Sequence, residues 1–234
     1  MSPSVRAINM ISLVDNDVIL KMGKWDLLSE LVALLGGDMS TIFHLATCRH
    51  VLCPPHKPAK ALKRCGDQAT VERIANFCAD TMPLPPPKET TWLKKLNEVP
   101  DIDTGEVLLF AVGLEEESSF TYIGDKRSLV ALAGNESLLG CVRALNGRIK
   151  CLEQIIAELI ASHTLDHILR KIRTRKDVDR AMNMVLGNRP QSKNTNDIWQ
   201  GLLSYYNHLN ELTGGLLAEF PCMPSILNEP HMVL

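Results

Sequence analysis

Long apolar runs are missing from the sequence, and we expect no secretory leader. No stretch reaches the roughly 18 residues of a membrane-spanning helix. The N-terminal segment "MSPSVRAINMISLVDND" passes from apolar residues straight into acids, without a small-residue cleavage site. We therefore expect a soluble, cytoplasmic protein without a membrane partner.

Neither sign of charge is in excess, and aromatic residues are scarce. A total of 25 Lys and Arg against 27 Asp and Glu gives a formal net charge of −2, which predicts no indiscriminate attraction to nucleic acid. Aromatic residues make up 5% of the chain, too few near the basic patches to favour base stacking. A Gly-rich phosphate loop of the Walker or dinucleotide type is also missing, which argues against a phosphatase-like or nucleotide-binding protein.

Cysteine is present in an odd number, seven, and its spacing suits no disulfide framework. Reduced thiols are typical of the cytosol. The segment "HLATCRHVLCPPH" gathers cysteines and histidines, but a Cys-x4-Cys spacing without a second pair is not typical of structural zinc. Buried thiols and surface histidines are the preferred interpretation of His44, Cys48, His50, Cys53 and His56.

Strand and helix patterns alternate through the first part of the chain, which predicts an α/β fold with a parallel sheet between helical layers. The continuous apolar run "AINMISLV" suits a strand that is covered on both faces. Strands are expected at 7–14, 41–45 and 119–123, with a last short one before 152. Helices are expected at about 18–35, 57–65, 69–79, from 89 on, and at 105–116, 125–133, 136–145 and 152–162.

The second part of the chain has helical patterns only, at 165–173, 177–187 and 197–213. We predict a domain at 1–163 and a helical extension with an apolar tail at 164–234. The proline-rich "MPLPPPKE" at 82–89 predicts a stiff surface connector, and "GNRPQSKNTND" a mobile loop. The tail from Gly214 is interpreted as a strap packed on the domain, with a partner-binding segment as the alternative.

Acidic residues follow two of the predicted strands. Asp15 and Asp125 close strands, and Asp103 and Glu106 begin a helix that a right-handed crossover brings to the same edge. Carboxylates gathered there raise one another's pKa unless a cation such as Mg²⁺ or Mn²⁺ lies among them. Such ions activate water for phosphodiester cleavage. Singly, each acid also suits a helix cap or a first helical turn, and Asp17 is expected to be a cap.

The motifs "VDNDVIL" at 14–20, "DTGEVLLFAVG" at 103–113, "YIGDKRSL" at 122–129 and "GRIKCLEQ" at 147–154 occur in this order. As an ordered set over about residues 7–180, they resemble a bacterial branch of the PIN-like domains. The resemblance implies a three-layer α/β/α sandwich and a divalent-metal-dependent nuclease, most often an endoribonuclease. By motif, Asp15, Glu106 and Asp125 match the Mg²⁺ or Mn²⁺ ligands, and Asp103 assists them.

Two departures from the family pattern keep an alternative open. The acid that usually follows the second strand is missing from "LATCRHVL", where Glu72 is a suggested substitute, and Ile123 stands where Thr or Ser is common. A catalytically degenerate PIN-like module that acts as an interaction scaffold is therefore the second hypothesis. The resemblance also suggests a homodimer, or a protein inhibitor such as an antitoxin, as partners.

Basic residues provide the expected contacts to nucleic acid. Lys126 and Arg127 stand beside the proposed metal, where they would hold a phosphate of the substrate. Six cations within "RKIRTRKDVDR", among them Arg173 and Arg175, predict a second contact surface, for which a solvated helix face is the alternative. A smaller group shares one predicted helix face: Lys57, Lys60, Lys63 and Arg64.

Overall fold

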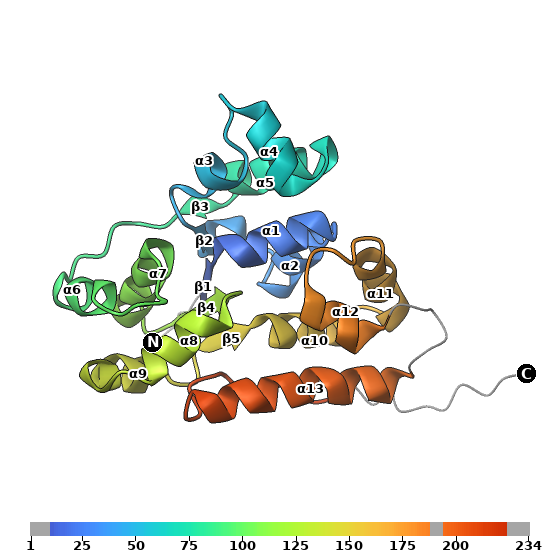
Figure 1. Cartoon of the computed structure of the whole chain (residues 1–234). Coiled ribbons are helices and arrows are strands. Elements are labelled where there is room, and N and C mark those ends of the chain that lie inside the picture. Colours follow the sequence, from blue (N-terminus) through green and yellow to red (C-terminus); the bar gives the residue numbers. More distant parts are fainter. Residues whose placement is uncertain (1–9, 188–193, 224–234) are drawn as a thin grey trace, which may run out of the picture.

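A five-stranded parallel sheet lies at the centre of the computed structural model, which describes residues 10–187 and 194–223 (Figure 1). The strand order is β3-β2-β1-β4-β5, and every pair is parallel. The predicted α/β fold with a central parallel sheet is confirmed. The strands are β1 (Ile11–Val14), β2 (Ile42–His44), β3 (Met82–Pro83), β4 (Ser119–Ile123) and β5 (Ile149–Cys151).

The central strand β1 is buried on both faces, as its apolar run predicts. Leu13 and Val14 are 1% and 0% exposed. Val14 lies opposite His44 on β2 and opposite Tyr122 on β4. The strand order turns back between β1 and β4, so the carboxyl ends of these two strands form the topological switch point where α/β sheets bind ligands.

Helices cover both faces of the sheet and make it the middle of three layers. The helices α1 (Asn16–Lys24), α2 (Leu28–Leu34), α5 (Gln68–Asp80) and α10 (Leu152–Ser162) pack against one another on one face. On the other face, α7 (Thr104–Glu115) packs on β1, β4 and α9 (Leu139–Leu145). The shorter helices are α3 (Cys48–Leu52), α4 (Pro58–Cys65), α6 (Thr91–Asn97), α8 (Lys126–Ala133) and the 3₁₀ turns η1 (Met39–Thr41) and η2 (Glu136–Leu138).

Three local predictions were wrong or incomplete. The single helix expected at about 18–35 is split into α1 and α2, because Asp26 has a left-handed φ of 57° and turns the chain. The short helix α3 was not predicted. The proline-rich connector contains β3, which is compatible with proline because it forms the edge of the sheet.

The C-terminal helices pack on the core and on one another. They are α11 (Leu165–Arg173), α12 (Arg180–Leu186) and α13 (Thr195–Leu212), and α13 contacts α10, α8 and α12. The division at residue 163 stays a prediction. Most of the predicted mobile loop, residues 188–193, lies outside the described residues. In the part of the chain that is described, no helix has both the length and the apolar character needed to cross a membrane.

The segment after α13 runs along the free edge of β5. Leu217 bridges Ile149 in parallel, and the Ala218 amide donates to the Ile149 carbonyl at 2.8 Å. Leu216 and Leu217 are 1% and 4% exposed. Residues 214–223 therefore form the predicted strap, while 224–234 lie outside the described residues.

The cysteines are unpaired thiols, six of which are buried or partly buried. Two pairs are in contact: the sulfurs of Cys53 and Cys65 are 3.7 Å apart, and those of Cys48 and Cys78 are 3.5 Å apart. These contacts join α3 to α4 and to α5. Among the residues described, no three His, Cys, Asp or Glu side chains are grouped so that they could hold a metal ion.

Candidate functional site

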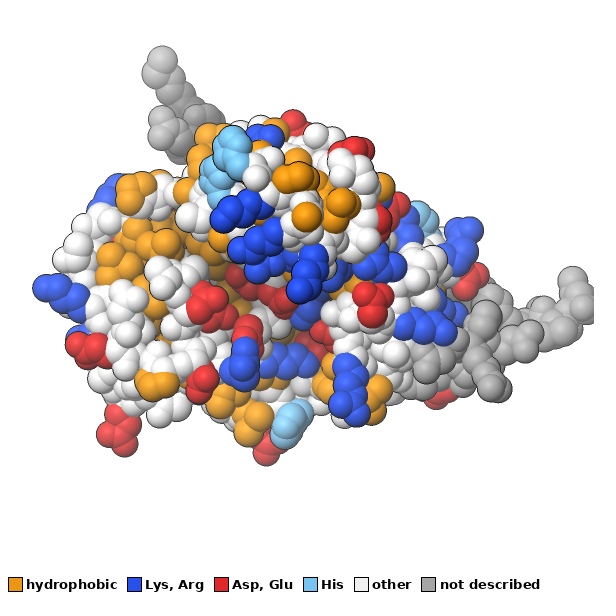
Figure 2. Space-filling model, turned by 45° about the horizontal axis from the view of Figure 1, so that its top comes forward, with side chains coloured by type: hydrophobic (Ala, Val, Ile, Leu, Met, Phe, Trp, Pro, Cys, Tyr) orange, Lys and Arg blue, Asp and Glu red, His pale blue; other side chains and the backbone are white. Residues whose placement is uncertain are grey.

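A cavity of about 830 Å³ opens at the switch point between β1 and β4. Acidic side chains gather in the hollow at the centre of the face shown in Figure 2, with basic side chains around it. All four predicted catalytic residues line this cavity, together with one further acid and one lysine. Its charged lining residues are Asp15, Asp17, Lys21, Asp103, Glu106 and Asp125.

Asp15 enters the cavity directly from the end of β1. It is the N-cap of α1, and its carboxylate accepts a hydrogen bond from the Asp17 amide at 3.3 Å. The side chain is nearly covered, because the residue is only 7% exposed. Burial, followed by the negative charge of Asp17, raises the pKa of Asp15 to about 6.

Asp103 and Glu106 form a capping box at the start of α7. Asp103 accepts from the Glu106 amide, and Glu106 accepts from the Asp103 amide, both at 2.9 Å. Glu106 is 4% exposed, and burial raises its pKa to about 7. The negative charges of Asp103 and Asp15 act in the same direction. Asp15, Asp103 and Glu106 line the same cavity, so the fold brings these three predicted acids together.

Asp125 caps α8 at the end of β4 and lies in a different electrostatic setting. It accepts from the Arg127 amide at 2.9 Å and pairs with the Arg127 guanidinium at 2.5 Å. The hydrogen bond from the Arg127 side chain holds the pKa of Asp125 below its ordinary value. The cavity therefore combines one acid whose pKa is lowered with two acids whose pKa burial raises.

Ser128 connects these two parts of the site. Its hydroxyl donates to the Asp125 carbonyl oxygen at 2.9 Å and also hydrogen-bonds the Glu106 carboxyl group. The contact with Ser128 lowers the pKa of Glu106, but burial has the larger, opposite effect.

Asp17 and Lys21 line the cavity without having been predicted as site residues. The prediction that Asp17 caps α1 was wrong, because Asp15 is the N-cap and Asp17 lies in the first turn of the helix. The Asp17 side chain pairs with Lys21 at 2.7 Å. Lys21 also pairs with Asp179 of the C-terminal extension at 2.8 Å. A Cβ at Gly124 would lie 2.1 Å from the Asp17 carboxylate, so the glycine before Asp125 permits this close approach. The Asp-x3-Lys spacing was the one sequence signal for the pair.

The predicted nucleic-acid contacts differ in how accessible they are. Lys126 pairs with the buried Glu153 and lies 5.0 Å from the ring of Tyr205. Arg173 donates to the Leu186 carbonyl at 2.8 Å. Arg127, by contrast, has a side chain that is 78% exposed at the rim of the cavity.

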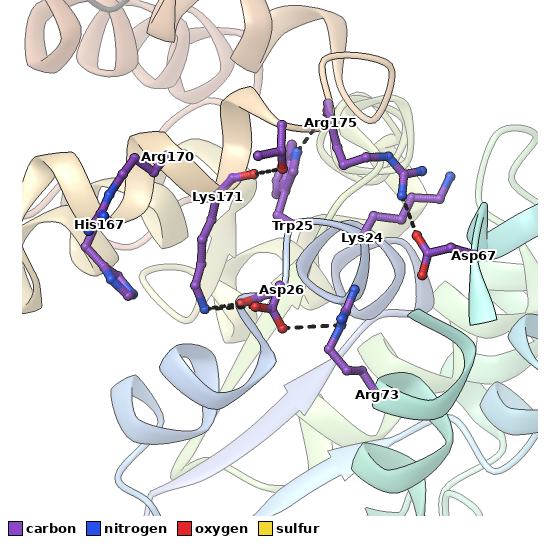
Figure 3. A pocket seen from close by; sticks show the side chains of 10 residues that line it. Lys24, Trp25, Asp26, Asp67, Arg73, His167, Arg170, Lys171 and Arg175 are labelled. Atoms are coloured by element: carbon purple, nitrogen blue, oxygen red, sulfur yellow. Dashed lines mark hydrogen bonds and ion pairs between the residues drawn. The ribbon is translucent and has the colours of Figure 1, made fainter. Parts of the chain in front are cut away.

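Arg175 lines a second pocket of about 550 Å³ at the far end of α1 (Figure 3). It pairs with Asp67 at 2.9 Å, and neighbouring Lys171 pairs with Glu30 at 2.8 Å. Three of the five Lys and Arg residues that line this second pocket, Arg73, Lys171 and Arg175, pair with acids.

Two further acids complete the description. Glu153 follows β5, is 0% exposed, and carries a carboxylate oxygen without a partner in the described residues. It was missed although it lies in the "GRIKCLEQ" motif. Glu72, the suggested substitute acid, is exposed on α5, accepts from Gln68 at 2.9 Å and does not line the cavity.

The donor chemistry of the cavity suits a hard divalent cation, because its acids offer carboxylate oxygens. Asn16 adds a side-chain oxygen that is buried in the cavity wall without a partner among the described residues. The acids are at present engaged in helix caps, and no three of the described ones form a ready ligand group. Backbone amides engage one carboxylate oxygen each of Asp15 and Glu106, so the second oxygen of each acid could hold an ion.

Comparison of the chain with protein-family models, with curated proteins and with solved structures finds no match. The site is therefore interpreted from its own residues and geometry.

Proposed function

We propose that this protein is a PIN-like, divalent-metal-dependent endonuclease that acts on RNA. The observation that supports this function is the cavity at the switch point of the sheet, into which Asp15, Asp103, Glu106 and Asp125 all extend. These residues come from three segments far apart in the sequence. The RNA preference comes from the motif resemblance.

In this proposal, Asp15, Glu106 and Asp125, assisted by Asp103, hold one or two Mg²⁺ or Mn²⁺ ions. A bound ion would supply activated water and stabilise the leaving oxygen of the phosphodiester. Asp15 and Glu106 would hold it as carboxylates, because a neighbouring positive charge favours their ionised form. Arg127, at the exposed rim, is placed to contact a flanking phosphate.

The test is Asp125→Asn, assayed for cleavage of a single-stranded RNA with Mn²⁺. Asn is as good an N-cap as Asp, so the fold should persist and circular dichroism should not change. Because second-shell changes alone cost about 10–100-fold, loss of a ligand should lower cleavage by more than about 100-fold. Asp38→Asn, at an exposed cap away from the cavity, should cleave normally. Unchanged cleavage by the Asp125 variant, or its unfolding, would contradict the assignment.

A specific observation favours a second function, a catalytically silent PIN-like module that binds a partner protein or nucleic acid. Each cavity acid already has an intramolecular partner, and no ready group of three metal ligands exists in the described residues. Titration with Mn²⁺ separates the two functions. A metal site gains thermal stability by mass action, whereas a silent cavity shows no shift in melting temperature.

A further inference from the structure

Residues 39–66 contain no acid, although the rest of the chain is acidic. This segment holds five cations, Arg49, Lys57, Lys60, Lys63 and Arg64. The whole chain carries −2 and the segment +5, so the remaining residues carry −7. Helices α3 and α4 lie in this segment, which also contains η1 and β2.

The cations of this segment point to solvent. Ala61 and Cys65 of α4 are 3% and 0% exposed and face the core. Lys57, Lys60 and Lys63 are exposed and recur every third residue, so they share the outer face of α4. Among the described residues, no carboxylate lies within ion-pair distance of these three lysines or of Arg49. Their charge is therefore available to a ligand.

This basic surface is fixed next to the acidic cavity. Thr47 and Val51, at α3, line the cavity wall. The Arg64 guanidinium donates to the Val51 carbonyl, and the Cys53 and Cys65 thiols are in contact, so α4 is held against α3. Figure 2 shows basic side chains along the edge of the hollow that contains the acids.

We propose that the outer face of α3 and α4 binds the phosphodiester backbone of a single-stranded nucleic acid whose neighbouring nucleotides enter the acidic cavity. This inference rests on the proposed nuclease function and assigns its substrate-binding surface. The cations are spread along a helix instead of converging on one point, which suits a chain of phosphates. The scarcity of aromatic residues favours contact with the backbone over stacking on bases.

Single strands are favoured because the cavity acids are recessed. Asp15 and Glu106 are 7% and 4% exposed, so a scissile phosphate must enter the cavity to reach them. A flexible single strand can bend into a cavity, whereas the stiff backbone of a duplex cannot. The affinity should therefore fall from single-stranded to double-stranded RNA of the same sequence.

The experiment measures binding separately from cleavage. Fluorescence anisotropy with a labelled single-stranded RNA is recorded in EDTA, for the full chain and for a Lys57→Glu, Lys60→Glu, Lys63→Glu variant. Each phosphate contact contributes about 0.7 to the salt slope, so three lost contacts lower it by about 2 and weaken binding roughly 100-fold at 0.1 M salt. The matched control reverses three exposed cations elsewhere: Lys88→Glu, Lys94→Glu, Arg143→Glu.

The control should bind within about threefold of the unmodified protein, since it has the same change of net charge at sites away from the cavity. Equal weakening in both variants, or no RNA binding by the unmodified protein in EDTA, would overturn the inference. So would preferential binding to duplex RNA or to phosphatidylglycerol vesicles. A parallel measurement with single-stranded DNA of the same sequence shows whether the affinity depends on the ribose 2′-hydroxyl. If the protein binds the RNA normally but does not cleave it with Mn²⁺, the proposed nuclease function fails while the binding surface stands.

Discussion

Asp15 has two roles that conflict at neutral pH. Its carboxylate caps α1, which favours the ionised form, but it is buried beside other acids, which favours the neutral form. Burial dominates, and the folded pKa of about 6 lies above the ordinary value of 3.8. Between these values the folded state binds more protons than the unfolded state. The contribution of Asp15 to the free energy of unfolding therefore falls as pH rises from about 4 to about 6.

We predict that Asp15→Asn stabilises the protein at pH 7 while it removes activity. Asn keeps the cap and carries no charge, so the free energy of unfolding should rise by roughly 1–3 kcal/mol at pH 7. The gain should disappear at pH 4, where Asp15 is protonated in the folded state. Urea unfolding from pH 4 to pH 8 measures both effects. The control is Asp38→Asn. Because the pKa of Asp38 is lowered in the folded state, this change should not raise the free energy of unfolding at pH 7.

For single residues, the rule that sites form at the carboxyl ends of parallel strands predicted much of the site. Asp15, Asp103, Glu106 and Asp125 were chosen because they follow strands or begin a helix, and the cavity contains all four. Asp179 could not be chosen in this way, because its contact with Lys21 joins residues 158 positions apart and depends on how α12 packs. The buried Glu153 was equally hidden, because sequence does not show that Lys126 turns toward it.

Helices differ in how much of their position is encoded locally. The bounds of α5 and β4 followed from periodicity and caps, and they agree with the structure. The break between α1 and α2 depends on the left-handed Asp26, which has no distinctive sequence signal. The edge strand β3 is equally undetectable, because two residues are too few for a period and only pairing with β2 defines it.

The contact between α1 and α12 predicts a pH dependence of stability opposite to that of Asp15. Burial raises the pKa of Asp179, but the hydrogen bonds from Lys21 and the Met182 amide and the charges of Lys21 and Lys126 together outweigh burial, and the pKa is lowered. Asp179 therefore contributes stability above its unfolded pKa, and this stability is lost as pH falls through the folded value.

Asp179→Asn keeps the cap of α12 and removes the ion pair. It should lower the free energy of unfolding by about 1–3 kcal/mol at pH 7, with a smaller deficit at pH 3. Urea unfolding at the two pH values checks this. Asp166→Asn, exposed in the first turn of α11, should stay within about 0.5 kcal/mol of the unmodified protein. An equal loss in both variants would mean that the Lys21 pair is not responsible.

For the whole molecule, the strap at 214–223 closes one edge of the sheet. Its backbone pairs with β5, and the Tyr206 hydroxyl donates to the Ala218 carbonyl at 2.9 Å. A free edge of this kind is a site for pairing with another chain. We therefore expect the strap to contribute to stability and to limit association through this edge.

Leu217→Ala should loosen the strap. Removing this buried side chain should cost roughly 2–5 kcal/mol and lower the melting temperature by roughly 5–15 °C. Size-exclusion chromatography should then show a larger associated fraction. Leu212, which is 53% exposed nearby on α13, provides the control, and its change to Ala should leave both readings unaltered. A stable, monomeric Leu217 variant would show that the strap is dispensable.

The acid-free segment at residues 39–66 also makes the charge distribution of the molecule uneven. With +5 gathered on one part and −7 spread over the rest, the protein is a permanent dipole despite its small total charge. A polyanion would exert a torque on such a molecule and turn α3 and α4 toward itself before any contact forms. Because ions screen this field within about 8 Å at physiological salt, the alignment is strongest in dilute buffer and acts on the speed of capture.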